Sequence, residues 1–162
     1  MTARRRTLAL LALALLVPAT LTGCRSNLAF EIDERIEILS PDDGEEVRLP
    51  MTVEWSARDY DGAFIVLVDR VPMRPDKTVG SLITDDDPCY DTSSCMEPAE
   101  LAERGIFLTS STSITIERLP DRRDDGSSKD RHDLTIVLAD ADGRRSGETA
   151  FVREFLVDRE DG

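Results

Sequence analysis

The chain has 162 residues, with 20 Lys and Arg against 33 Asp and Glu, so its formal net charge is −13. Such an acidic chain is a poor candidate for binding the nucleic-acid backbone, which attracts clustered cationic side chains. Because 40% of the residues are hydrophobic, the composition is that of a folded domain, and a single His with three Cys offers little material for a transition-metal centre or a histidine-based catalytic site.

Residues 1–23 have the pattern of an export signal. Arg4, Arg5 and Arg6 precede an uninterrupted run of Leu, Ala and Val at residues 8–17. A helix of that length spans about 15 Å, roughly half of the bilayer core. The run is therefore expected to be the hydrophobic region of a signal peptide rather than a membrane span. Twin-arginine export is the weaker alternative, because the rest of that motif is missing.

The end of this signal carries a more specific pattern. Leu21, Thr22, Gly23 and Cys24 resemble the lipobox of bacterial lipoproteins, in which Leu, a small residue and Gly or Ala precede a Cys. In that family the Cys receives a diacylglyceryl group and becomes the first residue of the mature protein. The resemblance implies lipidation of Cys24 with palmitate-type acyl chains, which together hold a protein on a membrane. A secreted protein with a chance Cys is the alternative.

Arg25 directly follows the lipobox cysteine. In the lipoprotein family, an Asp at this position instead resembles an inner-membrane retention signal. In a bacterium with two membranes, the resemblance therefore implies the outer membrane. Removal of residues 1–23 takes away three Arg and no acidic residue, so the net charge changes from −13 to −16. Such a surface repels anionic headgroups, which leaves membrane attachment to the acyl chains. Residues 24–34 are expected to form a tether of at most about 35 Å to a domain at residues 35–159.

From residue 35 onward, apolar and polar residues alternate with the period of β-strands. The run at residues 63–68 is continuously apolar, as expected of a central strand covered on both faces. Trp55 is the expected core anchor of its strand. The expected strands comprise residues 36–38, 51–57, 63–68, 114–116, 134–139 and 151–157.

Acidic turns flank two of these strands. Asp59 and Asp61 follow the second strand, and Asp140 and Asp142 lie in the hairpin before the last one. In a seven-stranded sandwich these two loops lie at the same end. Because Ca²⁺ is bound by six to eight oxygen ligands, the four carboxylates form a candidate structural Ca²⁺ site. The alternative is that Asp is simply a favourable turn residue, and no other cofactor is expected.

A long insertion at residues 74–109 contains Cys89 and Cys95. We expect them to form a disulfide, because export permits one and closing so short a loop stabilises a fold by about 2 kcal/mol. A redox-active pair is the alternative, although the spacing is not Cys-x-x-Cys. Pro98 and Gly105 are typical of the start and the end of a short helix between them.

The same insertion is the expected contact surface, because loops of this length are usually functional or disordered. Its candidate interface residues are Asp85, Asp86, Asp87 and Tyr90. Tyrosine is enriched at interfaces, and both Tyr60 and Tyr90 lie in expected loops. The alternatives are a solvated run of charge and ordinary partial burial of the two rings.

His132, the single histidine, stands next to Asp133 where an expected strand begins after a charged loop at residues 121–133. The favoured interpretation is a structural ring that bonds a nearby backbone group, and general-base chemistry is the alternative. No nucleophile, phosphate-binding or zinc motif is present in the sequence. We therefore do not expect an enzyme.

Two stretches resemble bacterial immunoglobulin-like domains. The first is Pro-Asp-Asp-Gly at residues 41–44, followed by Val47, Pro50 and a Val-x-Trp strand that ends at Trp55. The second, residues 132–143, is similar to the penultimate strand and hairpin of those domains. The resemblance implies an all-β, antiparallel immunoglobulin-like β-sandwich of about seven strands, with one short helix in a long loop insertion.

Together these features predict a non-catalytic, lipid-anchored cell-envelope protein that presents an immunoglobulin-like domain for adhesion or assembly. Its expected partners are the membrane, through the acyl chains, and another envelope protein or a glycan, but no nucleic acid. A carbohydrate- or peptidoglycan-binding module is the first alternative. A small envelope hydrolase is the second, ranked last because the sequence offers few groups for such chemistry.

Overall fold

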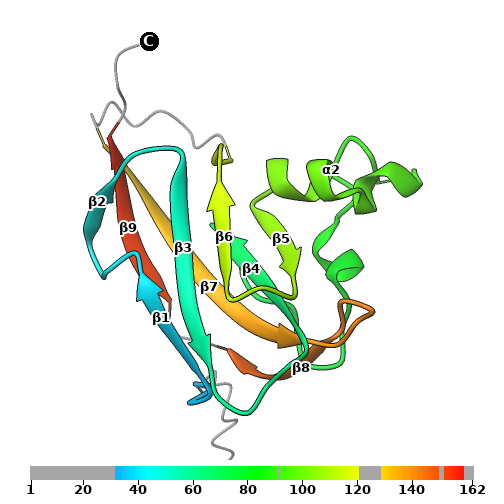
Figure 1. The fold of residues 1–162 in the computed structure, drawn as a ribbon. Coiled ribbons are helices and arrows are strands. Elements are labelled where there is room, and N and C mark those ends of the chain that lie inside the picture. Colours follow the sequence, from blue (N-terminus) through cyan, green and yellow to red (C-terminus); the bar gives the residue numbers. More distant parts are fainter. Residues whose placement is uncertain (1–31, 91, 121–128, 150–151, 159–162) are drawn as a thin grey trace, which may run out of the picture. The chain divides into compact units, whose positions relative to one another are not determined.

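Two β-sheets packed face to face form the framework of the described chain in the computed structural model (Figure 1). The structure describes residues 32–90, 92–120, 129–149 and 152–158. The leader and the proposed lipidation site, Cys24, lie outside these residues. Within the described residues, no helix is both long and apolar enough to cross a membrane.

The smaller sheet has the order β1–β3–β6, with β1 at Ile36–Ser40, β3 at Met51–Ala57 and β6 at Ser113–Ile116. The larger sheet has the order β2–β9–β7–β4–β5, and β8 also pairs with β7. Its strands are β2 (Glu45–Val47), β4 (Ala63–Val68), β5 (Ile106–Thr109), β7 (Lys129–Ala139), β8 (Arg145–Thr149) and β9 (Arg153–Asp158). Only β2 and β9 pair in parallel among these strands. The all-β expectation is confirmed.

The described residues contain nine strands rather than about seven. The three strands that were not expected are β2, β5 and β8. The chain leaves the smaller sheet after β1 and adds the short strand β2 to the larger one. At the other end, β8 and β9 follow one another along the side of β7 that faces away from β4. The short strand β5 is also part of the sheet, although its sequence was assigned to the insertion.

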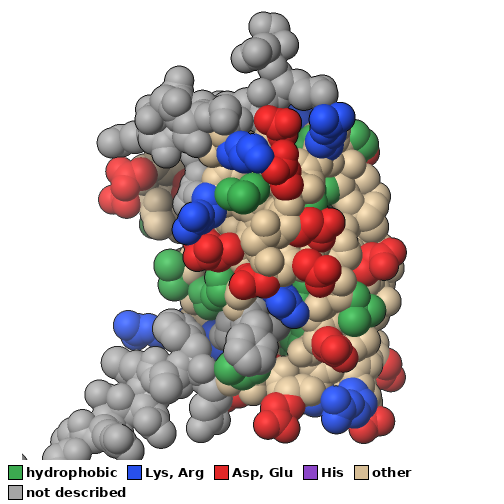
Figure 2. All heavy atoms as spheres, turned by 90° about the vertical axis from the view of Figure 1, so that its left-hand side faces the viewer, with side chains coloured by type: hydrophobic (Ala, Val, Ile, Leu, Met, Phe, Trp, Pro, Cys, Tyr) green, Lys and Arg blue, Asp and Glu red, His purple; other side chains and the backbone are tan. Residues whose placement is uncertain are grey.

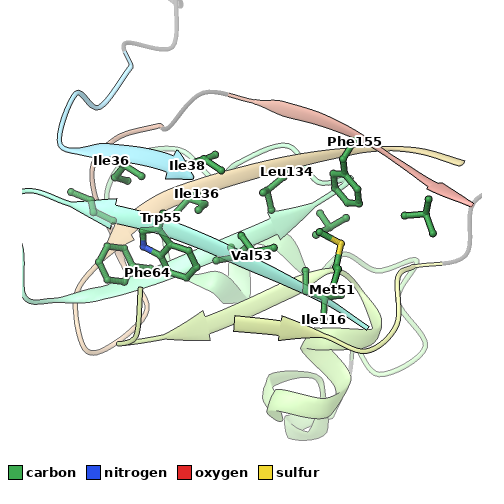
Figure 3. Close-up of a cluster of buried hydrophobic side chains, with 14 residues drawn as sticks. Ile36, Ile38, Met51, Val53, Trp55, Phe64, Ile116, Leu134, Ile136 and Phe155 are labelled. Atoms are coloured by element: carbon green, nitrogen blue, oxygen red, sulfur yellow. The ribbon is translucent and has the colours of Figure 1, made fainter. Parts of the chain in front are cut away.

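Apolar side chains from both sheets fill the space between them (Figure 3). Trp55 of β3 and Phe64 of β4 meet edge to face, with ring centroids 5.4 Å apart. The expected alternation in β3 is confirmed, because Met51, Val53 and Trp55 are buried while the residues between them are exposed. Burying these side chains supplies the main driving force for packing the two sheets.

The long insertion covers the outer face of the larger sheet. It contains two short 3-10 helices, η1 (Val79–Leu82) and η2 (Ser93–Met96), and the α-helix α2 (Pro98–Glu103). Val79 and Leu101, with the preceding Met73, pack onto the outward-facing side chains of β4 and β7. This second cluster explains why the strand at residues 63–68 is apolar on both faces.

One predicted loop is partly a strand. Residues 129–133 belong to β7, while residues 121–128 lie outside the described residues. The charged side chains are accommodated because they pair across the sheet: Lys129 forms an ion pair with Glu46, and Arg131 forms one with Glu154 at 3.3 Å. A local hydrophobic pattern does not predict ion pairs between residues so distant in sequence.

Candidate binding groove

A groove lies where the edges of the two sheets approach each other beneath α2. Its volume is about 800 Å³. Strand β5 is the last strand of the larger sheet, and β6 is the last strand of the smaller one. Both strands contribute to the groove, together with α2 and the residues that follow β6. The lining residues are Ala99, Ala102, Glu103, Phe107, Thr115, Glu117, Arg118 and Leu119.

The position of α2 over this groove is fixed at both ends of the helix. Pro98 occupies its first turn, as predicted. After the helix, Gly105 adopts a φ of +70°, and its carbonyl accepts a hydrogen bond from the Val68 N–H at 2.8 Å. A Cβ at Gly105 would lie 2.4 Å from the Val68 carbonyl oxygen. Only glycine therefore allows the chain to pass this close to β4.

A largely buried ion pair holds the other side of α2. The Arg104 guanidinium donates to Asp87 Oδ1 at 3.0 Å and to Glu100 Oε2 at 2.9 Å. The Thr84 backbone N–H donates to Asp87 Oδ2, and this bond, together with the Arg104 contact, lowers the pKa of Asp87. The hydrogen bond to Glu100, followed by that to Asp87, raises the pKa of Arg104. Asp87 is therefore a structural residue of the insertion.

The side chains that line the groove suit apolar and charged contacts rather than the stacking of a sugar ring. Its floor is apolar and includes Phe107 and Leu119, which pack against the sandwich core. Two exposed carboxylates, Glu103 and Glu117, lie at the groove with one exposed guanidinium, Arg118. Phe107 is the single aromatic ring in the lining, which gives little surface for stacking a sugar. Apolar groups flanked by positive charge fit this lining best.

The remaining candidate interface residues lie in the insertion but do not line the groove. Asp85 and Asp86 are exposed, and 53% of Tyr90 is exposed to solvent. Cys89 and Cys95 form a disulfide in the structure, with Cα atoms 5.2 Å apart. The disulfide links Cys89, which precedes Tyr90, to Cys95 of η2. These residues therefore stand on an anchored loop beside α2.

The four aspartates proposed for Ca²⁺ do not form a ligand set. The two turns do lie at the same end of the sandwich, because Ala63 pairs with Ala139. However, Asp140 Oδ1 accepts the backbone N–H groups of Asp142 and Arg144 at 3.0 and 2.9 Å, as a turn residue does. Within the described chain, no three His, Cys, Asp or Glu side chains gather as metal ligands. The site formed by Asp59, Asp61, Asp140 and Asp142 is thus not supported.

Tyr60 fills the space between these two turns instead of marking a contact surface. Its hydroxyl donates to the Ala139 carbonyl at 2.5 Å, and its ring meets Phe64 edge to face at 5.5 Å. The Arg35 guanidinium lies 5.8 Å from the centre of the ring. Tyr60 is therefore a structural residue that joins β4 and β7 at their shared end.

His132 is buried in β7, with only 2% of its surface exposed. Its Nδ1 lies 2.6 Å from Asp69 Oδ2, and its ring stacks on Phe155. Asp69 also accepts the backbone N–H of Asp133 at 3.0 Å. The predicted structural role fits this geometry, but the partner is a carboxylate rather than a backbone group. Asp69, which adopts a φ of 56° after β4, was not predicted.

Two buried charges were also missed by the sequence analysis. Arg145 of β8 donates to the Met73 carbonyl at 2.6 Å, and burial lowers the pKa of its guanidinium. Asp33 accepts the Arg35 side chain and the Glu148 backbone N–H, and the hydrogen bond from Arg35 is the main cause of its lowered pKa. These contacts attach the start of the insertion and the start of the described chain to β8.

Comparisons with protein-family models, with curated proteins and with solved structures found no match for the chain.

Proposed function

We propose that this chain is a non-catalytic, lipid-anchored protein of the bacterial cell envelope, whose immunoglobulin-like domain adheres to or assembles with another envelope protein. The anchor would be an acylated Cys24, supported by the lipobox pattern and the preceding export signal. In a bacterium with two membranes, Arg25 favours the outer one. The observation that carries the binding role is the apolar groove with exposed carboxylates beneath α2.

The chain path supports the immunoglobulin-like assignment. Two sheets face each other around a buried Trp, and adjacent strands come from distant parts of the chain. The first part of the chain contributes β1 to one sheet and β2 to the other, where β2 lies parallel to β9. The insertion between β4 and β5 is the feature that distinguishes this sandwich, and it builds the groove.

Within the described domain, the groove and the start of β1 lie toward opposite ends of β3. β1 begins at Ile36, which pairs with Ala57 at one end of β3. The groove residues after β6 follow Ile116, which pairs with Met51 at the other end of β3. Six residues of extended strand correspond to about 20 Å. The start of β1 and the groove residues after β6 are therefore separated by about the length of β3.

Another part of the surface offers less to a partner. Figure 2 views the domain from the side on which β1 and β2 lie in Figure 1, and there acidic and basic side chains are interspersed among small apolar areas. Such a surface is typical of a solvated face. A glycan-binding module, the alternative, is less well supported because Phe107 is the only ring in the groove and is half-buried.

The proposal is tested with radiolabelled palmitate and chemical crosslinking in the native bacterium. Wild-type protein should incorporate the label and should be recovered crosslinked to an envelope protein. A Cys24→Ala variant should incorporate none. Retention on purified cell wall without any crosslinked protein would favour the glycan alternative instead. A wild-type chain that takes up no palmitate would refute the anchor.

A further inference from the structure

The open edge of β6 carries a more specific inference, which rests on the proposed function. We propose that an extended segment of the protein partner adds to β6 as a further strand and places its side chains in the groove beneath α2. The segment would alternate apolar and basic residues. Three features support this site: the backbone register of β6, the absence of a charge or a proline from its four residues, and the charge of the groove.

The hydrogen bonds between β3 and β6 show which backbone groups face outward. The Trp55 N–H donates to the Thr112 carbonyl at 3.1 Å, so these residues form a hydrogen-bonded pair. Hydrogen-bonded and non-hydrogen-bonded pairs alternate along an antiparallel ladder. The next hydrogen-bonded pair is therefore Val53 with Ile114. The N–H and C=O of Thr115, one residue further along, point away from β3.

The outward side of β6 can accept another strand at Thr115, whereas the outward N–H of Ser113 already donates to Ser111 Oγ at 3.3 Å. Within the described residues, β6 pairs with β3 alone. Thr115 is exposed, and it also lines the groove. Proteins usually protect such edges with charged residues, proline or a bulge. The four residues of β6 (Ser113, Ile114, Thr115 and Ile116) include neither a charge nor a proline.

The neighbouring edge of the larger sheet is less accessible. The Val68 N–H donates to the Gly105 carbonyl, so the same alternation directs the outward backbone groups of β5 to Ile106 and Leu108. Ile106 is fully buried. The outer side of β5 is therefore already covered at its first residue, where α2 packs against it. Strand addition is favoured at β6.

A strand added to β6 would lie about 4.8 Å from it, on the side of the groove. Alternate side chains of that strand would share the inward direction of Ile114 and Ile116, toward the partly buried Phe107 and Leu119. Those side chains should be apolar. The remaining side chains of the added strand would lie near the exposed Glu117. The protein that they face has a net charge of −13. Arg118 is the only basic residue in the lining, so basic side chains are the better match.

The test is a selection of random displayed peptides on the purified full-length chain in detergent. Enriched peptides should alternate apolar residues with Lys or Arg. A Thr115→Pro substitution removes the outward N–H of residue 115 but no hydrogen bond to β3. It should therefore lower the affinity for the best peptide about tenfold or more. The matched control is Thr115→Val, which keeps that N–H and should leave the affinity nearly unchanged.

A second measurement leaves the protein unaltered. N-methylation of alternate backbone nitrogens in the selected peptide should abolish binding in one register and spare it in the other, since a strand pairs with only one of its edges. Failure to enrich any peptide, or binding that tolerates both Thr115→Pro and N-methylation, would overturn the strand-addition site. Crosslinking to an envelope protein that is equally strong in Thr115→Pro would also reject the site, while leaving the proposed function intact.

Discussion

Replacement of Gly105 by alanine should destabilise the domain and displace α2. The residue has a φ of +70°, which costs an L-residue with a Cβ about 1–2 kcal/mol. The new Cβ would also lie 2.4 Å from the Val68 carbonyl oxygen, an atom of the sheet backbone that cannot move independently. Relieving this clash should strain the hydrogen bond from Val68 N–H to Gly105 O, worth about 1 kcal/mol. We expect a loss of about 2–3 kcal/mol.

The assay is urea unfolding monitored by fluorescence of Trp55, the only tryptophan, which is buried between the sheets. Gly80→Ala is the matched control. Gly80 does not have a positive φ, and a Cβ there would meet only the Thr78 hydroxyl at 3.7 Å and the Met96 sulfur at 3.8 Å. That variant should stay within about 0.5 kcal/mol of the wild type. Equal unfolding free energies for the two variants would refute the close approach of α2 and β4.

Two further predictions concern contacts that hold the chain in place. Asp33→Asn should cost about 1–2 kcal/mol at pH 7, since it weakens the charged hydrogen bonds with Arg35. The pKa of Asp33 is lowered from 3.8 in the folded state, so its stabilisation is complete above that value and is lost as the pH falls through the lowered pKa. Urea unfolding at pH 7 and near pH 3 should therefore show a narrowing gap between wild type and variant; a constant gap would argue against the charged contact. Cys89→Ser should cost about 2 kcal/mol by opening the loop to Cys95, and dithiothreitol should abolish that difference. Identical stability without reductant would mean that the disulfide does not form.

Local patterns in the sequence predicted the elements whose environment is uniform along their length. The alternation of Met51, Val53 and Trp55 matches the single buried face of β3. The apolar run of β4 was correctly interpreted as covered on both faces. Pro98 and Gly105 marked the ends of α2. Proline restricts the backbone dihedral angles and glycine permits a positive φ, and both effects depend little on distant contacts.

Elements that depend on distant partners were missed. The first residues of β7 are charged and form a strand by pairing with the distant β9, where Lys129 and Arg131 also meet acidic partners. Arg145 is buried because it meets the carbonyl of Met73, a contact between residues 72 positions apart. Asp69 was not connected with His132 for the same reason. The residues that neighbour each position in the sequence do not indicate such contacts.

The insertion illustrates what length alone leaves open. Its size indicated a contact surface, but Val79 and Leu101 belong to a second hydrophobic cluster on the larger sheet. Asp87, chosen as a contact residue, is an ion-pair partner of Arg104. The groove instead combines the insertion with β6 and the residues after it, which are more distant in sequence. Locating it required the register of both sheets.

The most direct test of the proposed role is intact mass spectrometry of the protein isolated from native membranes. We expect a mature chain that begins at Cys24 and carries a diacylglyceryl group with acyl chains on that residue. A chain that retains residues 1–23, or one that begins elsewhere with an unmodified Cys24, would contradict it.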